Sequence, residues 1–248
     1  MFVVLAFGFV VGCAASEEPS AEDVSADALA QASAVDECVA SEDAQADALA
    51  ERAPADWLNT YRVMLAQAVK MEFPELAGIN IRVREGGSAS SFLGTSYGVG
   101  AFFRGPGARR YSIVVARKFK ASHPSDASVY TLLVHELQHI YDYEAMSGKS
   151  LLGFTLRYAI PGGEFVPAYE RATDLRAISR LHRSQHTNAP ILMGEYRQWQ
   201  YDHLGPLLVK VKKKNYLSPA EILQCDAALF DEDPLPQVCT VTSDLSRE

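Results

Sequence analysis

The sequence predicts an α+β protein in which a small antiparallel sheet is followed by a set of longer helices. Three observations support this class. Alternating apolar and polar residues at 79–84 indicate a half-buried strand, and the apolar run at 111–116 indicates another. Longer stretches with apolar residues at helical spacing follow at 128–146 and 167–186. Strands that precede helices in this way segregate into separate layers, as in the α+β class.

Ordinary start and stop signals delimit the other elements. Residues 56–72 carry apolar side chains at helical spacing, and Pro74 ends this predicted helix. Glycines recur from Gly86 to Gly107 among short apolar pieces, which is typical of strands joined by turns. The segment Ser218-Pro-Ala-Glu221 places Ser at the cap, Pro at the first helical position and Glu at the third, so it predicts a helix start.

Charge is spread unevenly along the chain. The 248 residues are 48% hydrophobic and 22% charged, as in ordinary globular proteins. The formal net charge is −8. Roughly a dozen acidic residues lie between Glu17 and Asp56, against the single base Arg52. The remainder is close to neutral, so the sequence predicts no nucleic-acid partner.

Residues 1–13 are predicted to be an export signal. The apolar run from Phe2 to Val11 is too short to span a bilayer, which takes about 20 apolar residues. It fits the apolar region of a secretory signal peptide, although no basic residue precedes it. The sequence Val-Val-Gly12-Cys13 resembles the lipobox of bacterial lipoproteins. This resemblance implies cleavage before Cys13, a lipid anchor there, and a location in the bacterial cell envelope at the periplasmic face of the outer membrane.

Two further segments complete the predicted organisation. Residues 14–55 have low hydrophobicity and one sign of charge, which predicts an acidic flexible tether. Residues 56–248 form the predicted folded domain. An envelope location permits disulfides among Cys38, Cys225 and Cys239, and the three alternative pairings remain open.

The segment His135-Glu136-Leu-Gln-His139 carries the main chemical signal. Residues four apart on a helix lie on one face, so the two imidazoles can reach a single metal ion. Glu136 lies beside the first histidine, where a carboxylate can take a proton from water at the metal. This pattern predicts a zinc site with His135 and His139 as ligands and Glu136 as general base.

A catalytic zinc site needs a third protein ligand. The longer metzincin pattern fails, because Asp142 and Ala145 stand where that pattern has Gly and His. Glu170 and Asp174 offer a carboxylate pair four residues apart on a later predicted helix. Together with the first motif this pair resembles the gluzincin metallopeptidases. That resemblance, which covers about 111–184, implies that residues 56–248 are a zincin-like metallopeptidase domain with zincin-like active-site helices. It also implies Glu170 as the third zinc ligand and Asp174 as a support for His135.

Other residues were weighed for roles in the same site or beside it. Asp142 and Glu144 are alternative third ligands, and the pair His182 and His186 could bind a second metal. His203, Tyr158 and Tyr169 are candidates for stabilising an oxyanion. A basic run is expected to be a solvated face or to contact anionic lipid or peptidoglycan; it consists of Lys210, Lys212, Lys213 and Lys214.

The sequence therefore predicts zinc-dependent hydrolysis of peptide bonds in a peptide or protein substrate, with membrane attachment through the N-terminal lipid. Two alternative functions remain open. One is a non-catalytic zinc-binding envelope lipoprotein that acts as a binding or scaffold protein. The other is a zinc hydrolase of a cell-wall amide bond, because the same site chemistry serves both bonds.

Overall fold

The computed structural model describes residues 57–86, 92–117, 124–160, 163–184, 186 and 188–224. The predictions about the export signal, the lipid on Cys13, the acidic tether and the disulfides all fall on residues outside these ranges. Within them the fold is mixed helix and sheet, so the predicted α+β class is confirmed. None of the described helices combines the length and the apolar character needed to cross a bilayer.

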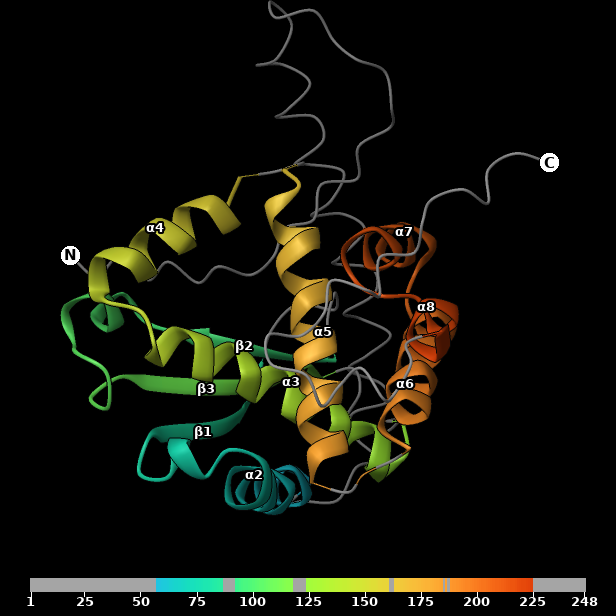
Figure 1. Ribbon diagram of the computed structural model, residues 1–248, viewed down its shortest axis with the longest axis horizontal. Helices are drawn as coiled ribbons and strands as arrows, with labels where there is room; N and C mark the ends of the chain where they lie inside the picture. Colours follow the sequence, from blue (N-terminus) through green and yellow to red (C-terminus); the bar gives the residue numbers. More distant parts are fainter. Residues whose placement is uncertain are drawn as a thin grey trace, which may run out of the picture.

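Three strands form one sheet in the order β1-β3-β2 (Figure 1). Strand β2 (Leu93–Tyr97) pairs antiparallel with β3 (Arg110–Val115), as predicted. Strand β1 (Asn80–Glu85) pairs with β3 in parallel, so the prediction of an antiparallel sheet is wrong for this pair. The burial of the inward side chains of β3 explains its place at the centre of the sheet, but the alternation that predicted β1 does not specify the direction of its neighbour.

The predicted helices are present with ends displaced by a few residues. The sequence did not predict the helices at 148–158, 189–203 and 206–215, because many of their apolar side chains are partly exposed. The described helices are α2 (Leu58–Glu72), α3 (Asp126–Glu144), α4 (Gly148–Tyr158), α5 (Phe165–Arg183), α6 (Ala189–His203), α7 (Pro206–Asn215) and α8 (Pro219–Gln224), with short 3-10 helices η1 (Pro74–Leu76) and η2 (Val99–Phe103).

Helix α3 lies at the centre of the molecule and contacts α2, α5, α6 and strand β2 (Figure 1). Every residue from Thr131 to Ile140 is buried, which is expected of a helix that is covered on all sides. Its start is capped by Ser125, whose Oγ accepts a hydrogen bond from the Ser128 N–H at 3.2 Å. The predicted start of α8 is likewise capped, since Ser218 and Glu221 exchange side-chain and backbone hydrogen bonds.

One buried cation fixes the C-terminal end of α3 to the sheet. Arg109, the residue before β3, is 0% exposed. Its guanidinium donates to the carbonyls of Ala101 at 3.2 Å and Met146 at 2.7 Å, and also to that of Tyr143. A positive charge at a helix C-terminus satisfies carbonyls that have no partner within the helix. Arg109 therefore sets the position of the helix that carries the histidines.

Replacing Arg109 by Met is expected to lower the free energy of unfolding by about 3 kcal/mol, since buried carbonyls lose charged hydrogen-bond donors. Urea unfolding measures this value. Arg110→Met is the matched control, because Arg110 is the next residue of the chain and is exposed. Equal stability of the two variants would contradict the role assigned to Arg109.

Candidate metal centre

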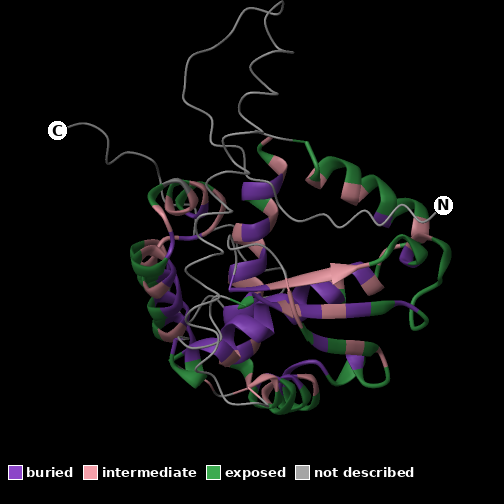
Figure 2. Cartoon of the chain, turned by 180° about the vertical axis from the view of Figure 1, so that it is seen from behind, coloured by how far each residue is buried: buried purple, intermediate pink, exposed green. Residues whose placement is uncertain are grey.

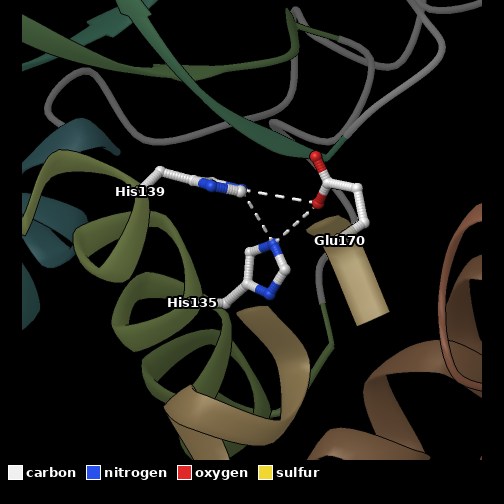
Figure 3. Close-up of side chains that lie close together, drawn as sticks. All are labelled: His135, His139 and Glu170. Carbon is white, nitrogen blue, oxygen red and sulfur yellow. Dashed lines mark hydrogen bonds and ion pairs between the residues drawn. The ribbon is translucent and has the colours of Figure 1, made fainter. Parts of the chain in front are cut away.

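Helices α3 and α5 bring three ligand atoms together in the interior. His135 and His139 lie one turn apart on α3, and Glu170 faces them from α5 (Figure 3). The two histidine Nε2 atoms are 3.1 Å apart. Glu170 Oε2 lies 3.3 Å from His135 Nε2 and 3.4 Å from His139 Nε2. The structure thus gathers the three residues that the sequence predicted as ligands.

The spacing of these atoms fits a tetrahedral metal ion. Zinc binds histidine nitrogen and carboxylate oxygen at about 2.0–2.1 Å, and two such ligands at the tetrahedral angle are about 3.3–3.4 Å apart. Glu170 Oε2 is buried and has no hydrogen-bond partner among the described residues, which is costly for an oxygen of this kind. A donor set of two imidazoles and one carboxylate favours zinc or a similar transition metal over calcium or magnesium.

A buried carboxylate orients the first histidine. Asp174 Oδ1 lies 2.9 Å from His135 Nδ1, at an oblique angle to the N–H bond. Asp174 also accepts hydrogen bonds from the Arg197 guanidinium at 2.6 Å and from the Leu217 N–H at 3.2 Å. A carboxylate facing Nδ1 keeps the proton on that nitrogen and leaves the Nε2 lone pair directed at the site.

A tyrosine orients the second histidine. His139 Nδ1 is 3.0 Å from the Tyr169 hydroxyl, which donates its own proton to Asp142 at 3.1 Å. The phenol oxygen therefore accepts from His139 Nδ1–H, and His139 Nε2 is also left free for a metal. Asp142 is held in turn by Arg176 at 2.9 Å. Asp142 therefore holds Tyr169 in position and does not take the ligand position that the sequence left open for it.

The convergence of two lone pairs and a carboxylate oxygen favours a cation. Burial lowers the pKa of His135, but Asp174 and Glu170 outweigh burial and raise it to about 9. Burial raises the pKa of Glu170, yet the rings of His139 and His135 hold it well below its usual range. Both shifts have the same cause, which is the close approach of carboxylates and imidazoles at one buried point.

Glu136 lies next to this point and is 6% exposed. Among the described residues no hydrogen bond reaches its carboxylate, which is therefore not engaged in holding the fold. Its backbone carbonyl accepts a hydrogen bond from the Thr95 hydroxyl at 3.0 Å. Thr95 belongs to β2, an edge strand of the described sheet, so this bond fixes that edge beside the histidine motif.

The burial of Lys212 beside the centre was not predicted from the sequence. Lys212 was expected in a solvated run, but the structure buries it to 8% exposure. Its Nζ lies 4.6 Å from the ring centre of Tyr216, which is 6.1 Å from that of His135. Burial and the nearby Arg197 lower the pKa of Lys212 to about 8, while Glu170 and Glu136 act in the opposite direction. The spacing of Lys212 and Tyr216, four apart, was the available signal.

The histidines proposed for a second metal are not brought together as a helical pair. Helix α5 ends at Arg183, so His186 lies beyond it and the same-face argument fails. His186 Nε2 is instead 3.4 Å from Glu72. The only group of three potential metal ligands in the described part of the chain is the one formed by His135, His139 and Glu170.

The remaining candidates take other positions. The carboxylate of Glu144 accepts from the Tyr111 hydroxyl at 2.5 Å and from the Gly107 N–H, so it braces a loop. The ring of His203 stacks on Trp199, with centres 4.4 Å apart. Tyr158 does reach the centre: its hydroxyl donates to Glu170 Oε1, which leaves Oε2 as the oxygen that faces the histidines.

Comparison with family models, with curated proteins and with solved structures gave no match for this chain. The assignment of the centre therefore depends on its own geometry.

Metal analysis by mass spectrometry tests the ligand set. Wild-type protein is expected to bind about one equivalent of zinc, and His139→Ala and Glu170→Ala are expected to lose it, because two protein ligands rarely hold a catalytic zinc. His203→Ala should retain the metal, since His203 stacks on Trp199 outside the group. Full zinc content in Glu170→Ala would show that the third ligand is another residue.

The support of His139 can be tested separately. Tyr169→Phe keeps the ring and removes the hydroxyl between His139 and Asp142, so zinc affinity is expected to fall about tenfold. Competition with a chromophoric chelator measures the affinity. Tyr141→Phe on the same helix as His139 serves as the control, and an equal affinity for both variants would contradict the orienting role of Tyr169.

Proposed function

We propose that this protein is a zinc-dependent peptidase whose centre is formed by His135, His139 and Glu170. The observation that carries the proposal is the convergence of these three ligand atoms beside Glu136, a carboxylate without a structural partner in the described part of the chain. When bound there, zinc lowers the pKa of a water molecule toward about 7 and polarises a carbonyl group.

Glu136 is the proposed general base. Its carboxylate accepts a proton from the attacking water and then delivers that proton to the nitrogen of the departing amine. Asp174 and Tyr169 hold the two imidazoles in the tautomer that keeps both Nε2 atoms free. Lys212 places positive charge among the carboxylates of this region, where negative charge on a carbonyl oxygen would be stabilised.

The neighbouring sheet edge favours a peptide as substrate. Strand β2 pairs with β3 on one side, and in the described sheet its other side has no partner strand. An exposed strand edge can bind an extended peptide through backbone hydrogen bonds. The Thr95 hydroxyl fixes this strand to the backbone of Glu136, which supports hydrolysis of a peptide over that of a cell-wall amide. The lipobox-like Cys13 supports an envelope location.

Replacing Glu136 by Gln is expected to leave the zinc content unchanged and to lower peptidase activity at least about a hundredfold, because the base is lost while the ligands remain. Cleavage of unfolded casein, abolished by a chelator and restored by zinc, gives the activity. Glu164→Gln is the control, since Glu164 is exposed at the start of α5.

The outcome separates the proposed function from its alternatives. Equal rates for Glu136→Gln and wild type would contradict the catalytic assignment. Zinc binding without cleavage of peptides or of cell-wall fragments would identify a binding or scaffold protein. Cleavage of cell-wall fragments alone would identify an amidase.

A further inference from the structure

Helix α4 has two apolar faces, of which only one is covered. The inner face lies over the metal centre: Leu151 is fully buried, Thr155 Oγ1 is 2.7 Å from the Tyr97 hydroxyl, and Tyr158 donates to Glu170. These contacts fix the orientation of the helix. They also determine which of its side chains must point away from the protein.

The outer face exposes large apolar side chains in a row. Leu152, Leu156 and Ile160 are 43%, 60% and 60% exposed. Leu152 and Leu156 lie one turn apart on one side of α4, and Ile160 follows two residues after the helix ends at Tyr158. Phe103, 86% exposed, extends from η2, against which the start of α4 packs tightly at Gly148. Phe103, Leu152, Leu156 and Ile160 together are called the α4 patch. Figure 2 shows the outer side of α4 as exposed.

The concentration of these side chains is unusual for a surface that faces only water. Single exposed apolar residues are normal, whereas a group that spans adjacent elements marks an interaction surface. Helix α2 also exposes Val63 and Met71, but these lie at the opposite end of the molecule (Figure 1).

The charge around the α4 patch identifies the kind of partner. No acidic residue occurs in the sequence from Gly148 to Gly163, and the first one after it is the exposed Glu164. Lys149 and Arg157 lie on α4 and are exposed, and Arg104 is exposed beside Phe103. The guanidinium of Arg157 lies 4.3 Å from the ring centre of Phe165. From Gly148 to Gly163 every charged side chain is therefore a cation, and apolar side chains accompanied by cations are complementary to an anionic lipid surface.

We propose that the α4 patch docks on the surface of an anionic lipid bilayer. The apolar side chains enter the boundary between headgroups and acyl chains, and Arg104, Lys149 and Arg157 contact the anionic headgroups. The inner face of α4 makes no contact with the bilayer in this arrangement, so docking leaves the metal centre intact. The inference goes beyond the proposed hydrolysis and does not depend on it, because it concerns the opposite side of the helix.

Hydrogen–deuterium exchange of the full chain tests this directly, because it reports on α4 even where the apolar N-terminus also binds lipid. We expect amides of 148–160 to exchange roughly tenfold more slowly on vesicles of equal parts phosphatidylglycerol and phosphatidylcholine than without vesicles. Vesicles of phosphatidylcholine alone should give less protection, because they lack the anionic headgroups.

Leu156→Ser with Ile160→Ser should abolish the vesicle-dependent protection and leave the zinc content unchanged. Val63→Ser with Met71→Ser is the matched control and should behave as wild type. The proposal is overturned if vesicle-bound wild type shows no added protection of α4, or if the double variant is protected equally. It is also overturned if protection grows with protein concentration in the absence of lipid, which would identify a second copy of the chain as the occupant.

Discussion

The site depends on the contact between helices α3 and α5, and above all on the hydrogen-bonded groups behind the ligands. The Nε2 atoms of His135 and His139 are 3.1 Å apart, and an acceptor lies close to each Nδ1: Asp174 at 2.9 Å from that of His135 and Tyr169 at 3.0 Å from that of His139. Glu170 then places a third acceptor atom at the same point. Without a cation these atoms repel one another, and this constraint explains the buried charges around them.

The supporting residues connect the centre to the rest of the fold. Asp174 is bound by Arg197 from α6 and by the backbone at Leu217, so the C-terminal helices help to set the tautomer of His135. Arg109 holds the C-terminal end of α3 through the carbonyls that close the helix. The candidate metal centre is therefore positioned by contacts at the middle of α3, through Asp174, and at its C-terminal end, through Arg109.

Much of the fold and of the candidate site could be predicted from the sequence, because local patterns specify local structure. The spacing of His135 and His139 predicted a shared helix face, and Glu170 and Asp174 were found four apart on a second helix. The parallel pairing of β1 with β3 could not be predicted, because alternation within a strand does not specify its neighbour. The burial of Lys212 was not predicted because the lysines of its run differ only in their distance from Tyr216, which lies four residues after Lys212.

The central claim is that two imidazoles and one carboxylate bind zinc. X-ray absorption at the zinc edge, on full-length protein loaded with one equivalent, tests it most directly. The account predicts two imidazole nitrogens and carboxylate or water oxygens at about 2.0–2.1 Å, with one imidazole lost in His139→Ala. Sulfur scattering at about 2.3 Å, or a shell of oxygens without imidazole, would contradict it.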